Sequence, residues 1–222
     1  HVVIDGASTD TTLALIRAHG RQPQVLVSEP DRGLYDAMNK GLRLATGDYV
    51  AFLNADDVYA RTDAVASMVH ACAAHDADAA WADLVYVRPD DLDAVVRYWK
   101  AEPFRPGLLE QGWMPPHPTL FVRRSLLQQL GGFDLRYRFH ADFDLVVRML
   151  SRPGLRTHHV PGILVRMRAG GHTNRSWRNV VRGNLESMRI LRTHKLRGGG
   201  TMLLHKLRHR GLQFLRRPAD MG

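Results

Sequence analysis

The chain has 222 residues, the length of one α/β domain of ordinary size or of two small ones. Hydrophobic residues make up 45% and charged residues 24% of it, which excludes a disordered or fibrous protein. Cys72 is the only cysteine, so no disulfide can form within the chain. No stretch contains the roughly 18–20 apolar residues that a membrane-spanning helix needs.

The net charge of +9 conceals a strong asymmetry along the chain. Residues 1–150 hold 15 basic and 20 acidic side chains, a net charge of −5, whereas residues 151–222 hold 16 basic and 2 acidic, a net charge of +14. The protein therefore combines a mildly acidic body with a strongly basic C-terminal third. This distribution argues against a uniformly basic chain of the kind that binds nucleic acid.

The first half of the chain alternates strand and helix patterns. Continuous apolar runs predict strands over residues 2–4, 24–28, 49–53 and 80–87. Apolar residues at helical spacing predict three helices, one capped by Ser8 or Thr9, one over 34–46 and one over 64–75. Such alternation predicts a mostly parallel sheet with helices on both faces, which is a three-layer α/β architecture.

The second half begins with residues 88–112, whose prolines and charges predict an irregular excursion over the sheet. Further patterns predict strands over 118–123 and 157–167, short helices over 124–130 and 142–151, and a turn over 131–134. A long helix is expected to begin near Ser176 and to present one apolar face, made of Trp177, Val181, Leu185, Met188 and Leu191. A basic amphipathic segment over residues 202–214 follows.

Polar residues follow three of the predicted strands. Asp5 ends the first strand, residues 29–36 follow the second, and Asn54–Asp57 follow the third. Since ligands of open α/β sheets bind beyond the carboxyl ends of the strands, these residues are expected to converge on one edge. Oxygen ligands there suit a hard divalent cation such as Mg²⁺ or Mn²⁺. A polar turn that caps a helix explains Asn54–Asp57 equally well.

Four other residues are candidates for chemistry. Asp142 and Asp144 lie in the first turn of a predicted helix, where the helix dipole favours acidic residues, so capping explains them without catalysis. His117 precedes a predicted strand, and His172 follows two glycines that would let it reach a metal or a phosphate. Cys72 lies in an Ala-rich helix and is expected to pack rather than react.

In their order and spacing, these segments resemble the family 2 glycosyltransferases of GT-A fold, in particular bacterial enzymes that build exopolysaccharide, lipopolysaccharide or glycolipid saccharides. The matching segments are residues 3–12, 28–41, 45–49, 52–57, 117–124, 132–134 and 141–145. The resemblance implies a nucleotide-diphospho-sugar transferase fold, a three-layer αβα sandwich whose first strand–helix unit is missing. Residues 1–175 would form the transferase domain, and 176–222 a basic helical extension.

The resemblance also implies a donor site and a metal. Asp5 would recognise the base of the donor nucleotide, and the donor pocket would be shaped by Asp31, Gly33, Asp36, Asn39, Lys40 and Asn54. Asp56 takes the metal position of the family's Asp-X-Asp motif, in which Asn54 replaces the first Asp. Asp57 and His172 are additional candidates as ligands of Mg²⁺ or Mn²⁺.

On the acceptor side, Asp142 matches the family's general base, which deprotonates the attacking hydroxyl. His117 and Asp144 are the further acceptor-side candidates. Ala141 stands where many members carry Glu before the base.

The implied activity is inverting transfer of a sugar from a nucleoside-diphosphate sugar to a saccharide or lipid-linked acceptor in bacterial surface polysaccharide or glycolipid synthesis. A non-catalytic, membrane-peripheral relative that keeps the fold is the alternative, and a different metal-dependent phosphoryl enzyme is a weaker third. The basic and apolar C-terminal third predicts contact with an anionic membrane, so the expected location is cytoplasmic, at the inner face of the cell membrane. A solvated helix that packs on the catalytic body is the alternative explanation of this segment. Nucleic acid is not an expected partner, because no recognition motif or stacking aromatics accompany the basic residues.

Overall fold

The computed structural model describes residues 1–18, 25–170 and 177–198, together with 202, 211 and 213. Its strands are β1 (Val2–Asp5), β2 (Val25–Ser28), β3 (Tyr49–Val50), β4 (Val58–Tyr59), β5 (Ala79–Arg88), β6 (Asp91–Trp99), β7 (Phe121–Arg123) and β8 (Thr157–Arg168). Its α-helices are α1 (Thr12–Ala18), α2 (Leu34–Leu44), α3 (Ala64–Ala74), α4 (Arg124–Gln129), α5 (Ala141–Leu150) and α6 (Trp177–Thr193). Two short 3-10 helices, η1 (Leu109–Gln111) and η2 (His117–Thr119), lie between β6 and β7.

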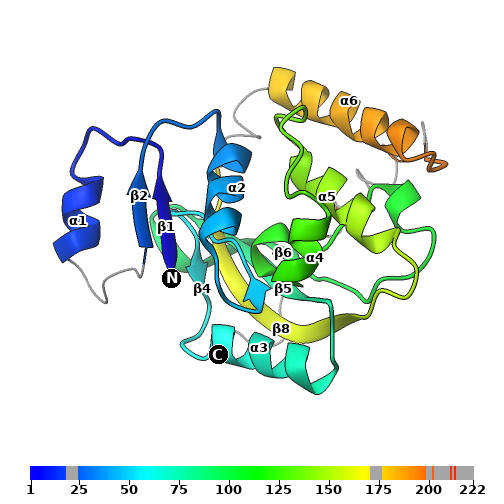
Figure 1. Cartoon of the computed structure of the whole chain (residues 1–222), viewed down its shortest axis with the longest axis horizontal. Coiled ribbons are helices and arrows are strands. Elements are labelled where there is room, and N and C mark those ends of the chain that lie inside the picture. The colour runs from blue at the N-terminus through cyan, green and yellow to red at the C-terminus, as the bar shows by residue number, and fades with distance from the viewer. Residues whose placement is uncertain (19–24, 171–176, 199–201, 203–210, 212, 214–222) are drawn as a thin grey trace.

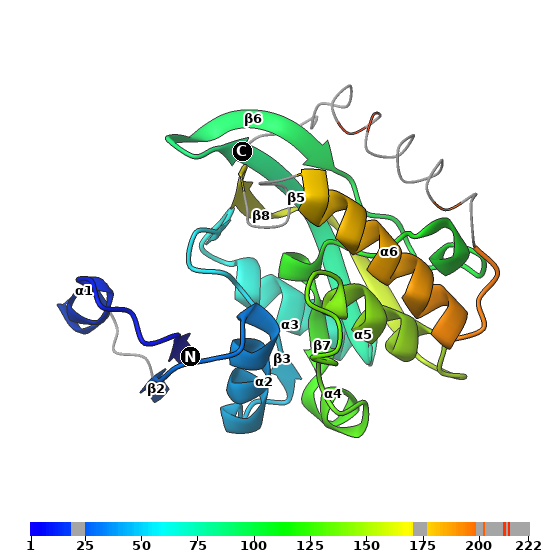
Figure 2. The same cartoon turned by 90° about the horizontal axis from the view of Figure 1, so that it is seen from above.

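The strands form two sheets (Figure 1). β1 and β2 pair in parallel as a two-stranded sheet, which lies with α1 on the side of the molecule away from α6 (Figure 2). The larger sheet has the order β3-β7-β5-β8-β4, with β6 paired to β5, and only β5 and β8 run parallel in it. The prediction of a mostly parallel sheet is wrong there. β6 returns beside β5 through a short turn, and β3, β4 and β7 pair antiparallel with strands that are remote in sequence.

Helices cover both faces of the larger sheet, so the three-layer αβα architecture is confirmed (Figure 1). On one face, Met68 and Cys72 of α3 pack against Ala80 and other even-numbered residues of β5. On the other face, Trp81 joins a larger core that contains side chains of α2, α4, α5 and α6. Successive residues of β5 thus enter different cores, because side chains alternate between the faces of a strand.

The α6 helix is present, but the predicted buried face is displaced. Val181 and Leu185 are 49% and 56% exposed, whereas Ser187, Ile190 and Leu191 are buried. Small residues explain the difference: Gly183 is buried as well, and with Ser187 it lets the helix approach the segment that precedes α5. The spacing of apolar residues alone does not predict a contact that is made by small and polar residues.

Three local predictions also differ from the structure. Residues 88–112 are not wholly irregular, because Asp91–Trp99 form β6, a hairpin partner of β5. The strand predicted over 49–53 is regular only at Tyr49–Val50. The α1 helix begins at Thr12, whose N–H binds Asp10, while Ser8 binds Asp5 instead of capping the helix.

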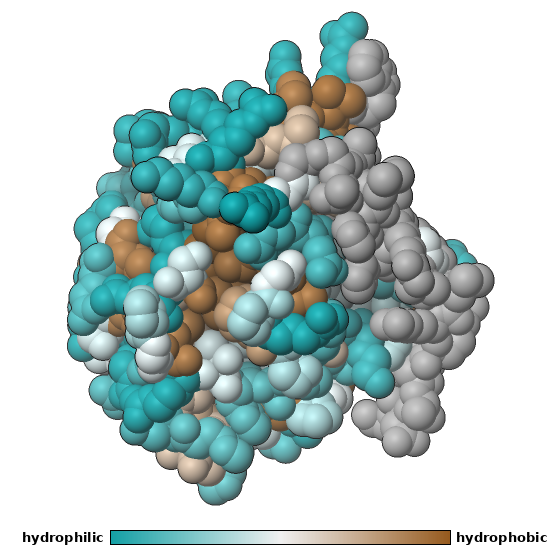
Figure 3. Space-filling model, turned by 90° about the vertical axis from the view of Figure 1, so that its right-hand side faces the viewer, coloured by the Kyte–Doolittle hydropathy of each residue, from teal (hydrophilic) through white to brown (hydrophobic). Residues whose placement is uncertain are grey.

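The surface seen in Figure 3 is mostly hydrophilic, with an apolar area near its middle. None of the described helices is long and apolar enough to cross a membrane. The basic segment predicted over 202–214 lies outside the described residues, apart from positions 202, 211 and 213.

Candidate active site

A cavity of about 1640 Å³ brings together residues that lie far apart in the sequence. Its walls come from α2 and the loop before it, the turn after β3, β6 and the loop that follows, the start of α5, and α6. Five of the predicted site residues line it: Asp31, Asn54, Asp56, His117 and Asp142. The donor-side and acceptor-side candidates therefore share one space.

Asp142 reaches this cavity from the first turn of α5. Its Oδ1 accepts hydrogen bonds from the backbone N–H of Phe143 at 2.8 Å and from the Tyr35 hydroxyl at 3.0 Å. Within the part of the chain that the structure describes, Oδ2 accepts no hydrogen bond, so it is the oxygen that a ligand can use.

Tyr35 of α2 orients this carboxylate, and sequence reasoning did not single it out. Its hydroxyl lies 3.1 Å from the Phe139 carbonyl oxygen and 3.0 Å from Asp142 Oδ1. Burial, followed by the negative charge of Asp142, raises the pKa of Tyr35 well above its ordinary value. The hydroxyl therefore stays protonated and acts as a donor. Its only signal in the sequence is its place at helical spacing one turn before the buried Met38.

His117 belongs to a cluster of three aromatic rings, of which His117 and Phe52 line the cavity and Phe133 does not. The His117 ring lies 5.9 Å from that of Phe52 and 5.6 Å from that of Phe133, measured between centroids. Burial lowers the pKa of His117, and the negative charge of Asp142 opposes this only in part. The imidazole is therefore neutral at neutral pH, able to donate one hydrogen bond and accept another.

The turn after β3 carries the predicted metal ligands. The Asp57 backbone N–H donates to the Asn54 carbonyl at 3.1 Å, and Asn54 Nδ2 donates to Asp57 Oδ2 at 3.3 Å. Burial, followed by the charge of Asp56, raises the pKa of Asp57 to about 6. Asp56 is exposed to the cavity, whereas Asp57 is 4% exposed.

Two oxygen atoms of this turn test whether a cation fits. Oδ1 of Asn54 and Oδ1 of Asp57 are both buried, and neither has a hydrogen-bond partner among the residues that the structure describes. Buried oxygens without a donor are rare, and a hard cation is a natural partner for them and for the Asp56 carboxylate. No cluster of three His, Cys, Asp or Glu exists among the described residues, so phosphate oxygens would have to complete the coordination. The donor set thus fits Mg²⁺ or Mn²⁺ bound together with a phosphorylated substrate.

Basic residues also line the cavity, and one of them contacts this turn. Arg168, the last residue of β8, donates hydrogen bonds to the backbone carbonyls of Asp56 and, at 3.2 Å, of Pro89. Lys100 and Arg105 line the cavity as well. A positive rim of this kind suits an anionic ligand. Arg168 was not predicted, because its role depends on where β8 ends relative to the turn.

The other predicted donor residues lie outside the cavity lining. Asp5 is buried and accepts hydrogen bonds from Ser28 and Ser8, which lower the pKa of Asp5. Asn39 donates to the Phe133 carbonyl at 2.9 Å and accepts from the Phe133 N–H at 2.8 Å. It therefore holds the backbone of Phe133, whose ring packs against that of His117. Contact of Asp5 and Asn39 with a donor nucleotide stays a prediction.

Gly33, Asp36 and Lys40 shape the loop that carries Asp31. Asp36 accepts hydrogen bonds from the backbone and the guanidinium of Arg32, and Lys40 Nζ binds the Pro30 carbonyl at 2.7 Å. The Gly33 N–H donates to Asp31 Oδ1 at 2.7 Å, and the φ of Gly33 is +116°. Only Asp31 of these residues lines the cavity, so the others support its position.

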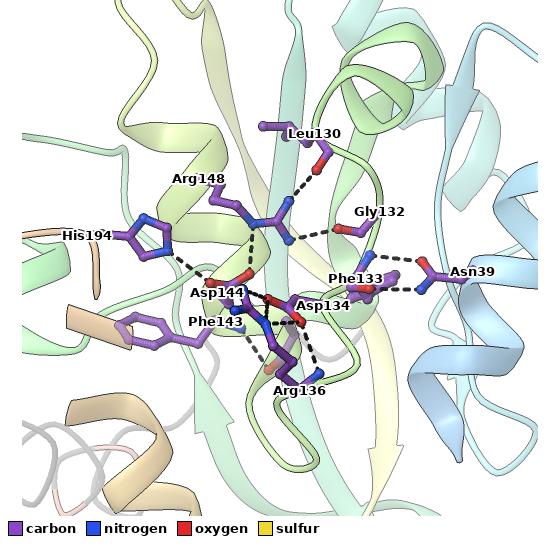
Figure 4. A network of polar contacts seen from close by, with 11 residues as sticks. Asn39, Leu130, Gly132, Phe133, Asp134, Arg136, Phe143, Asp144, Arg148 and His194 are labelled. Atoms are coloured by element: carbon purple, nitrogen blue, oxygen red, sulfur yellow. Dashed lines mark hydrogen bonds and ion pairs between the residues drawn. The ribbon is translucent and has the colours of Figure 1, made fainter. Parts of the chain in front are cut away.

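Asp144, which was predicted on the acceptor side, lies outside the cavity lining. Its side chain is buried, pairs with Arg148 at 2.7 Å and lies 2.9 Å from His194 Nε2 (Figure 4). Each helical residue turns by about 100°, so Asp144 points to nearly the opposite side of α5 from Asp142. His172, the remaining metal candidate, lies outside the described residues.

Comparison with known proteins shows the family from the sequence and the type of fold from solved structures. The model of the family described as Glycosyl transferase family 2 matches residues 1–131. A PGL/p-HBAD biosynthesis glycosyltransferase of Mycobacterium tuberculosis is 35% identical over 162 residues, which cover 72% of this chain and 61% of the relative. A second glycosyltransferase of Mycobacterium tuberculosis is 34% identical over 151 residues, 67% of this chain and 56% of that protein. The chain thus spans about three fifths of the length of these relatives.

Solved structures agree in fold. S. aureus TarS 1-349 superposes with a TM-score of 0.63 at 15% identity, over 92% of this chain and 58% of that chain. The mannosyltransferase PcManGT from Pyrobaculum calidifontis, solved in complex with GDP-Man and Mn²⁺, gives a TM-score of 0.58 at 22% identity, over 94% and 59%. With the family model matching more than half of its residues, the chain belongs to glycosyl transferase family 2.

Proposed function

We propose that this protein is an inverting glycosyltransferase that moves a sugar from a nucleoside-diphosphate sugar to a saccharide or lipid-linked acceptor. The observation that carries the proposal is that one cavity holds both the Asp142 carboxylate and the Asn54–Asp57 turn. The first can accept a proton, and the second offers oxygens without partners beside a basic rim. Sugar transfer from an activated diphosphate needs both functions.

The donor side is assigned to the Asn54–Asp57 turn. Asp56 would hold a Mg²⁺ or Mn²⁺ ion with the free oxygens of Asn54 and Asp57, and the ion would neutralise charge on the departing diphosphate. Arg168 and Lys100 would attract the same phosphates from the rim. The neighbours solved with UDP, with UDP-GlcNAc, and with GDP-Man and Mn²⁺ support this class of donor.

Asp142 would act as the general base. As the acceptor oxygen bonds to the anomeric carbon, the bond from that carbon to the diphosphate oxygen breaks, and the hydroxyl proton passes to Asp142 Oδ2. The Tyr35 hydroxyl and the Phe143 N–H donate hydrogen bonds to Oδ1, which leaves Oδ2 for the acceptor. One displacement with one base inverts the anomeric configuration.

Apolar residues on the other side of the cavity support an acceptor with a lipid or aromatic part. This side is lined by Val96, Trp99, Trp113, Met114 and Phe139. Such side chains bind apolar groups and bury large areas. The naming of a relative for PGL/p-HBAD biosynthesis supports the same class of acceptor, and with it a role in bacterial glycolipid or surface polysaccharide synthesis. A lipid-linked acceptor would also locate the protein at the inner face of the cell membrane.

Nucleotide binding and sugar transfer test the proposal separately. Binding of UDP, GDP and dTDP is measured by calorimetry with and without Mn²⁺, followed by transfer assays with a panel of nucleotide sugars. We expect Mn²⁺-dependent binding of at least one nucleotide, loss of that binding in Asp56→Ala, and retained binding with about 10²–10⁴-fold slower transfer in Asp142→Asn. Binding that is equally strong in Asp56→Ala would contradict the donor assignment. A wild-type chain that binds vesicles but neither binds nor hydrolyses donors would favour the non-catalytic relative.

A further inference from the structure

Three consecutive backbone N–H groups converge on one carboxylate close to Asp142. Glu186 of α6 accepts from Arg138 at 3.0 Å through Oε1, and from Phe139 at 2.8 Å and His140 at 3.0 Å through Oε2. These donors belong to the segment 138–140, which leads into α5 and ends two residues before Asp142. The Glu186 carboxylate therefore holds the backbone from which the proposed base projects.

Neighbouring positions on α6 contact the same segment. Ser187 is fully buried, and its Oγ lies 2.6 Å from His140 Nδ1. One turn earlier, Gly183 packs on the His140 ring so closely that a Cβ there would come within 3.0 Å of Cε1. This face of α6 is thus shaped to the backbone and the ring of one short segment, which is more than nonspecific packing requires.

The segment is also held from the opposite side. The Phe139 N–H binds Glu186, while the Phe139 carbonyl lies 3.1 Å from the Tyr35 hydroxyl, which binds Asp142 as well. The peptide unit between Phe139 and His140 is thus bonded by two helices that are remote in sequence: its carbonyl accepts from Tyr35 of α2, and its N–H donates to Glu186 of α6. A shift of residues 138–140 would move both the start of α5 and the hydroxyl that orients the Asp142 carboxylate.

We propose that Glu186 is a positioning residue for sugar transfer, which sets where Asp142 Oδ2 lies although Glu186 itself does not line the cavity. The inference rests on the proposed function, in which Asp142 is the base. Small misplacements of a catalytic group lower the rate of the chemical step while substrate binding persists. A role in folding alone would instead lower stability and leave the turnover of the folded protein unchanged.

Glu186→Gln in the full 222-residue chain is the first test, since it keeps the side-chain shape but turns one acceptor into a donor that faces backbone N–H groups. We expect kcat to fall about tenfold or more, with KM for the donor sugar and nucleotide affinity within about twofold of wild type. Glu110→Gln is the matched control, because Glu110 lies outside the cavity lining. A kcat equal to that of wild type in folded Glu186→Gln would overturn the inference.

A double-mutant cycle separates action through Asp142 from an independent effect. If Glu186 acts by placing Asp142, adding Glu186→Gln to Asp142→Asn should lower the residual transfer rate no further, so the two losses are strongly non-additive. An equal fold-loss in both backgrounds would overturn the inference. Wild-type protein that transfers no sugar would contradict the proposed function itself, whereas active wild type with an unaffected variant contradicts only the role of Glu186.

Gly183→Ala serves if Glu186→Gln fails to fold. The added methyl would push against the His140 ring and shift the segment 138–140 while Glu186 stays in place. The same separation of a lowered kcat from an unchanged KM for the donor is expected. An unchanged kcat in this variant, with the thermal unfolding midpoint as the check on folding, would overturn the inference.

Discussion

At the scale of single residues, the Tyr35 hydroxyl is the side-chain donor that touches the proposed base directly. Tyr35→Phe removes this donor and keeps the ring, whose centroid lies 5.3 Å from that of Phe133. We expect transfer to slow about tenfold, because Asp142 then loses one of the two bonds that fix Oδ1. Stability should fall by about 1 kcal/mol, the usual contribution of one hydrogen bond.

Steady-state kinetics and urea unfolding measure the two effects of Tyr35→Phe. Tyr49→Phe is a useful comparison, because the Tyr49 hydroxyl also donates a hydrogen bond, to the Ala77 carbonyl at 2.9 Å, but Tyr49 lies outside the cavity lining. It should lose stability without the same loss of kcat. Transfer at the wild-type rate in Tyr35→Phe would show that the carboxylate is oriented without this contact.

His117 gives a prediction about pH. Burial lowers the pKa of His117 below its ordinary value of 6.5, so the folded protein binds a proton there less readily than the unfolded chain. Its contribution to the free energy of unfolding is therefore complete above about pH 6.5 and is lost as the pH falls below that value.

His117→Phe keeps an aromatic ring between Phe52 and Phe133 but cannot be protonated. We expect the unfolding midpoint of this variant to fall less than that of wild type between pH 7 and pH 5. Thermal unfolding at a series of pH values measures the difference. Parallel curves for the two proteins would mean that His117 protonates as easily in the fold as in the unfolded chain.

At the scale of elements, the Arg148 guanidinium joins α5 to the turn after α4 and, through Asp144, to α6 (Figure 4). It donates to the carbonyls of Leu130 at 2.6 Å and Gly132 at 2.7 Å, besides pairing with Asp144. Arg148→Met would leave a buried carboxylate and two carbonyls without this partner. We expect destabilisation of about 3 kcal/mol, since removing one partner of a buried ion pair leaves an uncompensated charge.

Arg152→Met is the matched control for this prediction. Arg152 is exposed, one turn beyond Arg148, and its hydrogen bond at 3.2 Å goes to the Gln129 side chain. Its loss should cost less than about 0.5 kcal/mol. Urea unfolding of both variants measures the two losses of stability. Similar midpoints would show that the contacts of Arg148 contribute no more to stability than the exposed contact of Arg152.

Most elements could be predicted from the sequence because their own side chains carry the pattern. The apolar run of β5 and the spaced apolar residues of α5 are buried as their periodicity indicates. β6 was missed because its residues are half-exposed, although Pro89 and Asp90 at its turn are typical of a hairpin connection. The buried face of α6 could not be predicted, since Gly183 and Ser187 make contacts that an apolar pattern does not record.

At the scale of the whole molecule, the site likewise contains residues that could be predicted from the sequence and residues that could not. The family resemblance implied that Asp142 and the Asn54–Asp57 turn lie near each other, and Asp142, Asn54 and Asp56 line the cavity. The sequence contains no local sign that Tyr35 binds a residue 107 positions away, or that Glu186 binds the backbone of residue 138 across 48 positions. Such contacts depend on how helices meet in space, so only the folded chain identifies these supporting residues.

The charge asymmetry of the molecule leads to the last prediction. The exposed face of α6 combines Val181 and Leu185 with the exposed Arg182 and Arg192, and it lies in the basic third of the chain. Apolar side chains beside basic ones favour an anionic lipid surface, where each basic residue contributes about 1 kcal/mol. We therefore expect the protein to bind vesicles that contain phosphatidylglycerol, and to bind them less at high salt.

Vesicle flotation with a double variant of α6 tests the contribution of this face. Val181→Ser combined with Leu185→Ser should reduce binding to anionic vesicles, because it removes the apolar side chains that would enter the interface. Val65→Ser combined with Val69→Ser is the matched control, since these residues are similarly exposed, at 46% and 42%, on α3, which covers the other face of the sheet. Equal loss of binding in both double variants, or equal binding of wild type to neutral vesicles, would contradict a membrane-facing α6. Retained binding in the α6 variant alone would assign the attraction to basic residues elsewhere in the C-terminal third.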